Sequence, residues 1–295
     1  MQQNGQVPVG TMLRMRYHEF HESEKKVADF VMGPRCHELL TAPVVTAAAL
    51  MGVSEATVIR FCKKIGLSGY SQLKLIIARE AGAHEVSGQE EMPDHMIDRK
   101  SRVEDLPQKM IFNAINGLKD TLAVVDVEML KKAVSAITSA RRIALFGVAN
   151  SAVVCEDIHC KLMRLGFVCD VYSDAHQQLT AAVHMKPGDV AIGISHSGQT
   201  KDVVNAVRLA GEKGAETICI SNYTHSPLTE VSNIHLLTGG HEASFMSEAM
   251  VSRISQLAII DMLYVGIILS DYDAYSAGLS YVNEQVRDKA YEKPY

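Results

Sequence analysis

The stretch Ser195-His196-Ser197-Gly198-Gln199-Thr200 joins two segments with different hydrophobic patterns. The apolar run 190–194 before it is short and rich in β-branched residues, which indicates a buried parallel strand. Residues 201–213 after it repeat apolar side chains at helical spacing. Open α/β sheets bind ligands at such loops, between the carboxyl end of a strand and the start of a helix. The stretch therefore predicts an α/β sheet with a ligand site here.

The side chains of this loop suit an anion. Backbone N–H groups and the positive end of the helix dipole favour negative charge at a helix start. Gly198 lets the backbone approach the ligand, and Ser195, Ser197 and Thr200 add hydroxyl donors. A phosphate group fits this chemistry. An ordinary polar turn with Thr200 as the helix N-cap is the alternative interpretation.

Strands and helices alternate on both sides of the loop, which predicts a doubly wound parallel sheet. The other expected strands span residues 142–146, 167–172, 216–220 and 234–237. The expected helices span residues 152–165, 175–184, 226–232, 247–269 and 275–291.

A second loop, Gly147-Val148-Ala149-Asn150-Ser151, follows the expected strand 142–146. It lacks the spaced glycines of a dinucleotide-binding turn, and the sequence has no Gly-Lys-Ser/Thr P-loop. Because the carboxyl ends of parallel strands share one sheet edge, we expect Asn150 and Ser151 to hold one small ligand together with the 195–200 loop.

The first 80 residues predict a helical domain. Helices are expected at 25–32, 45–51 and 55–65, and a further helix from Gly69 to about Arg79. The turn Gly52-Val53-Ser54 joins the second and third of these helices, with Ser54 as N-cap. Two helices joined by a tight glycine turn form a helix-turn-helix.

The expected helix 55–65 has two faces. Its inward face holds Val58, Phe61, Cys62 and Ile65, and its outward face holds Ala56, Thr57, Arg60, Lys63 and Lys64. Small residues near the start and cations after them are what a DNA recognition helix needs. We expect Arg60 and Thr57 at base edges, and the full DNA-binding set is Ser54, Glu55, Thr57, Arg60, Lys63, Lys64 and Lys74. A surface helix with solvated lysines is the alternative.

Composition and charge agree with a soluble two-domain protein. The chain has 295 residues, of which 47% are apolar and 21% charged. The net charge of −5 is uneven, because residues 1–80 carry +3, which suits contact with a polyanion. The start of the chain lacks the pattern of a signal peptide, and the most apolar run, 257–269, is shorter than a membrane span. We therefore expect a cytoplasmic location and no membrane contact.

The six cysteines are scattered without a Cys-x-x-Cys pair, and Cys62, Cys155 and Cys219 sit in apolar patterns. We interpret them as reduced core thiols rather than as disulfides or a metal site. The sequence also indicates no cofactor and no catalytic residue.

Two motifs carry a resemblance to known families. The 195–200 loop resembles the Ser-x-Ser-Gly-x-Thr signature of the SIS (sugar isomerase) domain, and 147–151 resembles that domain's first ligand loop, with Ala149 where a second glycine is usual. Residues 54–70 are similar to the helix-turn-helix segment of RpiR-type transcriptional regulators.

The resemblance implies a homodimeric or homotetrameric regulator that binds an operator in double-stranded DNA and responds to a sugar phosphate. By position, Ser151, Ser195, Ser197 and Thr200 would hold the phosphate, with Asn150, His196 and Gln199 beside them. The expected domains are a DNA-binding domain at 8–84, a linker with connecting helices at 85–130, an SIS domain at 131–271 and a C-terminal helix at 272–295. Within the connecting region, helices are expected at 106–124 and 127–137.

A phosphosugar isomerase with an accessory helical domain is the alternative function. An aldose–ketose isomerase needs a base near the reacting carbons, usually Glu or His. The sequence offers five such residues, His176, His196, His225, Glu242 and Glu248. A helix-turn-helix has no role in that reaction, which favours the regulator.

Overall fold

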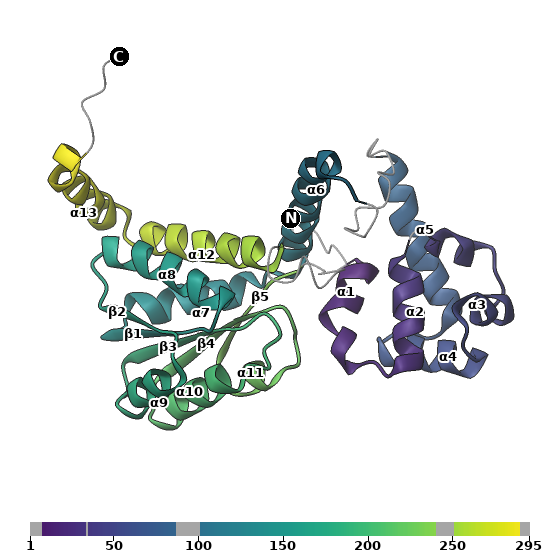
Figure 1. Ribbon diagram of the computed structural model, residues 1–295, viewed down its shortest axis with the longest axis horizontal. Coiled ribbons are helices and arrows are strands. Elements are labelled where there is room, and N and C mark those ends of the chain that lie inside the picture. Colours follow the sequence, from purple (N-terminus) through teal and green to yellow (C-terminus); the bar gives the residue numbers. More distant parts are fainter. Residues whose placement is uncertain (1–7, 34, 87–100, 240–250, 290–295) are drawn as a thin grey trace, which may run out of the picture. The chain divides into compact units, whose positions relative to one another are not determined.

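The computed structural model describes residues 8–33, 35–86, 101–239 and 251–289 (Figure 1). The chain divides into two units. The first unit runs to Ala123 and includes Gly239, and the second holds the rest. Each unit has its own apolar core.

The first unit is helical. Its α-helices are α1 (Val9–Met15), α2 (Glu22–Met32), α3 (Val44–Met51), α4 (Glu55–Lys64), α5 (Tyr70–Val86) and α6 (Leu106–Val124). Short 3-10 helices lie at Tyr17–Glu19 (η1), Cys36–Leu40 (η2) and Val103–Asp105 (η3). Leu13, Val27, Phe61 and Leu73 are among the fully buried side chains of its core. The sequence did not predict α1, η1 or η2, because each is too short for an apolar repeat.

The helix-turn-helix is confirmed between α3 and α4, which meet at 93°. Gly52 ends α3 in the left-handed conformation, with φ at 65°, and the Val53 N–H donates to the Ala48 carbonyl. Ser54 then begins α4, because its side chain accepts a hydrogen bond from the Thr57 N–H.

Helix α5 is longer than the sequence predicts. The expected end near Arg79 is wrong, because the helix continues to Val86, just past the expected start of the linker at residue 85. Ala81 and Ala83 flank Gly82 and favour helix, which offsets a glycine cost of about 1 kcal/mol. Residues 87–100 of the expected linker lie outside the described residues.

The second unit contains a five-stranded parallel sheet. Its strands are β1 (Arg142–Phe146), β2 (Cys169–Tyr172), β3 (Asp189–Ile194), β4 (Glu216–Ser221) and β5 (Ile234–Leu237). The order in the sheet is β2-β1-β3-β4-β5, and every described pair is parallel. β2 begins two residues later than its expected start at Phe167.

Helices cover both faces of this sheet (Figure 1). One face carries α7 (Val127–Thr138), α8 (Asn150–Arg164) and α12 (Val251–Ser270), and the other carries α9 (Ala175–Val183), α10 (Lys201–Glu212) and α11 (Pro227–Glu230). Separate apolar clusters lie under the two helix layers. The predicted doubly wound α/β fold is therefore confirmed.

Two helices close the chain. The expected start of the first, Ser247, lies outside the described residues, which resume at α12. The second, α13 (Tyr272–Gln285), begins earlier than the expected Tyr275 because the Asp271 side chain caps it at the Ala274 N–H. It ends at Gln285 rather than Tyr291, and a 3-10 turn, η4, follows at Arg287–Lys289.

Helix α12 corrects one expectation about apolar length. The run 257–269 was judged too short for a membrane span, but the described helix Ser252–Ser270 is long and apolar enough by length and composition. Ile259, Ile260 and Leu263 are buried in the core cluster that α12 shares with α7 and α8. This packing accounts for the apolar side chains on the buried face of α12.

The close approach of α10 to the sheet makes Gly193 a test of the core. A Cβ atom there would lie 2.6 Å from Val207 Cγ2 and 3.1 Å from Leu228 Cδ1. We expect Gly193→Ala to lower the free energy of unfolding by about 1–3 kcal/mol, because overpacking forces these side chains to move. Urea unfolding measures this. In the control Gly278→Ala, the new methyl group on α13 meets nothing within 4 Å, so equal losses in both variants would contradict the explanation.

Candidate functional site

The strand order places two loops at one edge of the sheet. The chain leaves β1 toward β2 on one side and later returns to β3 on the other side, so β1 and β3 are adjacent. Their loops, 147–149 and 195–200, therefore both leave the carboxyl edge at the point where the winding reverses. Ligands of doubly wound sheets bind at this point.

The 195–200 loop forms a network of hydroxyls. Ser195 is only 2% exposed, and its Oγ lies 2.9 Å from Thr200 Oγ1. Two hydroxyls that share one hydrogen bond keep one further proton to donate. Thr200 is the N-cap of α10, yet its side chain makes no capping hydrogen bond within the described chain. The first N–H groups of α10 therefore remain suited to an anion.

Gly198 is required by its conformation and its neighbours. Its φ is 63°, and an added Cβ would lie 2.2 Å from Ser226 Oγ. Its carbonyl accepts the Leu228 N–H at 3.0 Å, which fixes the loop against the start of α11. Next to it, Ser197 Oγ accepts the Gln199 N–H at 3.2 Å and keeps its own proton for another acceptor.

The strand β4 supports the same loop from the other side. The His196 carbonyl accepts the Asn222 N–H at 3.0 Å and the Ser221 hydroxyl at 3.3 Å. The His196 ring meets the Tyr223 ring edge-to-face, with centroids 5.8 Å apart. Gln199 is exposed at the rim.

The first loop has a backbone that only tight packing can hold. Ala149 has a φ of 52°, a backbone conformation that residues other than glycine rarely adopt. Gly147 has no room for a side chain, because a Cβ would lie 2.7 Å from Cys155 Sγ. Asn150 begins α8 in an exposed position, and Ser151 is half-buried behind it.

Gln178 on α9 supports this loop and was missed by the sequence analysis. It is fully buried, and its Nε2 donates to the Gly147 carbonyl at 3.2 Å and to the Tyr172 carbonyl at 2.9 Å. It thereby ties the carboxyl ends of β1 and β2 together. A single glutamine in a helical pattern gives no signal of this role, which depends on where α9 packs.

Two candidate bases of an isomerase also follow carboxyl ends of strands in the described sheet, because His176 comes after β2 and His225 after β4. His176 and His225 are exposed side chains. The Asp174 side chain caps α9, because it accepts a hydrogen bond from the backbone N–H of His176. Glu242 and Glu248 lie outside the described residues. His196 is the one of the five whose loop belongs to the described ligand site.

In the helical unit, α4 presents part of its expected outward face. Ser54, Glu55, Arg60 and Lys63 are exposed, and Arg60 is 65% exposed. The outward position of Thr57 is wrong, because its side chain is buried and lies 2.9 Å from Ser54 Oγ. Thr57 stands one turn before the buried Phe61, so helical geometry places it on the packed side.

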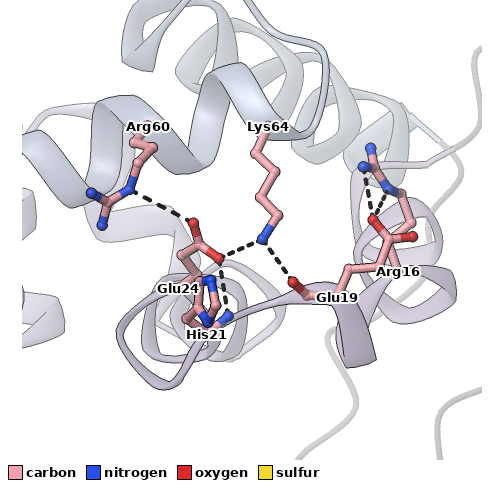
Figure 2. A network of polar contacts seen from close by, with 6 residues as sticks. All are labelled: Arg16, Glu19, His21, Glu24, Arg60 and Lys64. Atoms are coloured by element: carbon pink, nitrogen blue, oxygen red, sulfur yellow. Dashed lines mark hydrogen bonds and ion pairs between the residues drawn. The ribbon is translucent and has the colours of Figure 1, made fainter.

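The outward position of Lys64 is also wrong. Its Nζ donates to Glu24 Oε2 and to the Glu19 carbonyl, both at 2.7 Å (Figure 2). The same Nζ lies 5.5 Å from the Phe20 ring centroid. Burial acts to raise the pKa of Glu24, but the Lys64 hydrogen bond, the His21 N–H and the Lys64 charge lower it below its usual value. Glu24 is therefore ionised, and Lys64 is part of the fold.

Tyr70 and Lys74 connect α5 to the segment before α3. The Tyr70 hydroxyl donates to the Leu39 and Ala42 carbonyls, and burial raises the pKa of this phenol. The side chain of Tyr70 is thus buried inside the domain. Lys74 Nζ lies 3.4 Å from the Ala42 carbonyl oxygen and is half-buried.

Four of the six cysteines are buried, but the expectation of core thiols is wrong for Cys160, which is exposed on α8, and Cys36 is only half-buried. Cys62, Cys155 and Cys219 are buried as expected, and all six are free thiols. Burial raises the pKa of Cys62 to about 11, so the thiol stays protonated at neutral pH. The described residues contain no group of three His, Cys, Asp or Glu side chains suited to a metal ion.

Family comparisons match both units. Residues 8–84 match the helix-turn-helix domain of the rpiR family, and residues 136–266 match the SIS domain. An uncharacterized HTH-type transcriptional regulator of Caldanaerobacter subterraneus is 37% identical over 89% of this chain and 91% of its own. A second uncharacterized HTH-type regulator, from Haemophilus influenzae, is 30% identical over 87% of this chain and 88% of its own.

Solved structures show the same fold. The Vibrio vulnificus NanR protein complexed with ManNAc-6P aligns over 96% of this chain and 100% of its own, with a TM-score of 0.60 and 24% identity. The sugar isomerase domain of an RpiR transcription factor from Sphaerobacter thermophilus aligns over 61% of this chain and 99% of its own, with a TM-score of 0.55 and 24% identity.

The two domain matches, the 37% identical relative and the helix-turn-helix joined to a doubly wound sheet all agree. The chain belongs to the RpiR family of helix-turn-helix transcriptional regulators that carry an SIS domain.

Proposed function

We propose that this regulator binds an operator in double-stranded DNA and that a sugar phosphate in its SIS domain controls the binding. The observation that carries the proposal is the hydroxyl loop 195–200 at the uncapped start of α10, in a chain that also holds a reading helix. That NanR binds ManNAc-6P supports the same ligand class.

In this proposal the phosphate lies against the start of α10. The hydroxyls of Ser151 and Ser197 donate to its oxygens, together with the one proton that the Ser195–Thr200 pair keeps free, and the backbone of Gly198 leaves it room. Asn150, His196 and Gln199 border the ligand from the two loops. The helix dipole of α10 adds to the attraction, since its positive end faces the anion.

On the DNA side, the exposed part of α4 enters the major groove. Arg60 reads a base edge, and Ser54, Lys63 and Lys74 meet phosphates around it. Glu55 stands at the start of α4, where its carboxylate accepts a hydrogen bond from a cytosine amino group or interacts favourably with the positive end of the helix dipole. Thr57 and Lys64 act through the fold instead.

The regulation works by linkage. The effector binds one arrangement of a homodimer or homotetramer better than another, and that arrangement spaces the reading helices differently. Two copies are needed because operators read by a helix-turn-helix are usually two half-sites. The protein acts in the cytoplasm, where DNA and sugar phosphates meet.

The first prediction separates base reading from phosphate contact. Arg60→Ala should weaken operator binding by about 1–3 kcal/mol and relax specificity at one base pair, because a bidentate contact is lost. Lys63→Ala should weaken binding to every sequence and lower the salt slope by about 1. Gel shifts over a salt series measure both. Lys131→Ala, an exposed lysine of α7, is the matched control, and parent-like behaviour of both reader variants would show that another face reads DNA.

The second prediction concerns the ligand loop. Ser197→Ala removes one donor to a charged group, which costs about 1.5–3 kcal/mol, so effector affinity should fall by roughly one to two orders of magnitude. Operator binding without effector should persist, because the loop is not in the reader. Calorimetry with candidate sugar phosphates measures the affinity. Ser173→Ala, an exposed serine outside both loops, is the control, and unchanged affinity in Ser197→Ala places the phosphate elsewhere.

The third prediction separates the regulator from the isomerase. We expect the protein to bind a sugar phosphate without converting it, because its relatives are named as transcriptional regulators and the described loops supply hydroxyls. NMR of aldose and ketose phosphates incubated with protein follows any conversion. Turnover in proportion to protein concentration would support the isomerase.

A further inference from the structure

A buried carboxylate lies against the reading helix. Glu24 projects from the first turn of α2, and its side chain is 3% exposed. Its Oε2 accepts the His21 N–H at 3.0 Å and Lys64 Nζ at 2.7 Å, and its Oε1 lies 3.8 Å from Arg60 Nε (Figure 2). One carboxylate therefore contacts two cations of α4.

The contact with Arg60 has a direction. Glu24 faces the Nε side of the guanidinium, and Figure 2 shows the Nη groups pointing away from the carboxylate. A bidentate contact to guanine uses one edge of the planar guanidinium. The group that holds one edge of the Arg60 guanidinium therefore sets the direction in which its other edge points. Because Arg60 is 65% exposed, its outer edge stays accessible to DNA.

The contact with Lys64 has the opposite effect. The Lys64 ammonium donates hydrogen bonds to Glu24 and to the Glu19 carbonyl, and the Lys64 side chain is 28% exposed. Lys63, the residue before it, is exposed. These cations, with His21, Ser23 and Glu24, line an open hollow of about 800 Å³. Glu24 thus divides neighbouring cations into one that is held inward and others that face solvent.

Stability alone is a poor explanation for this arrangement. A buried ion pair pays a large desolvation cost, and apolar residues of similar volume often stabilise a fold as well or better. A charged group at this place does something apolar packing does not, because it holds Lys64 by a hydrogen bond and Arg60 by an ion pair at 3.8 Å.

We propose that Glu24 is a positioning residue for DNA recognition, which orients Arg60 toward the bases and withholds Lys64 from the phosphates. The inference rests on the proposed role of α4 as the reading helix. Glu24 itself touches no DNA. It raises specificity in two ways: it stabilises one orientation of Arg60, and it limits the contacts of Lys64 with phosphates, which every DNA sequence offers.

Glu24→Gln tests this role, because it keeps the shape of the side chain and removes its charge. Binding to operator and to random duplex DNA is measured by fluorescence anisotropy over a salt series. We expect random DNA to bind more tightly, with a salt slope steeper by about 0.9, because the released Lys64 reaches one more phosphate. The ratio of operator to random affinity should fall about tenfold, because Arg60 loses its orientation.

Two further variants make the result specific. Glu22→Gln removes the same charge from an exposed carboxylate on the same turn of α2 and should leave slope and ratio as in the parent. The double variant Glu24→Gln with Lys64→Gln should recover the salt slope of the parent, since no extra cation is released. Its ratio of operator to random affinity should stay low, because Arg60 still lacks its partner. It leaves no buried charge unpaired, so it carries the test if the single variant fails to fold by circular dichroism.

A structural role alone gives a different pattern. If Glu24→Gln lowers the affinities for operator and random DNA equally, with the salt slope unchanged, the inference is wrong. A parent-like ratio of operator to random affinity in the folded double variant also overturns it. Failure of the proposed function is distinguishable, because the parent protein itself would then show no preference for any stretch of its own upstream DNA.

Discussion

The pairing of β1 with β3 is the constraint on which the ligand site depends. Their register, from Arg142 opposite Asp189 to Phe146 opposite Gly193, aligns the two carboxyl ends. β2 lies on the outer side of β1, and β4 on the outer side of β3, so the helices that follow β1 and β3 leave toward opposite faces. A crevice at such a reversal of the winding is where doubly wound sheets bind ligands, and the proposed site lies there.

The local details of the two loops follow from that constraint. Close packing of α8 on β1 excludes any side chain at Gly147, and Ser226 excludes one at Gly198. Ala149 keeps a φ of 52° because the surrounding packing, including buried Gln178, fixes the chain on both sides of it. The backbone of the proposed anion site is therefore held by strand ends and helix starts.

The reading unit relies on a different interaction. Glu24 is buried with its charge, and the cations of α4 offset the cost of that burial. The same contacts that hold α4 to α2 decide which cations of α4 reach solvent. Packing and recognition are therefore not separate properties of this helix, in contrast to the SIS unit, where the apolar core and the hydroxyl loops use different residues.

The sequence by itself determined the local features: the alternation of strands and helices, the turn at Gly52, the hydroxyl loop and the family. These depend on periodicity and on single residues with strong local preferences, such as Ser54 at a helix start. Only the tertiary structure decided the strand order, the support by Gln178, and the inward positions of Thr57 and Lys64. The reason is physical, because a lysine looks alike in sequence whether it meets solvent or a buried carboxylate, and Glu24 stands forty residues away in the chain.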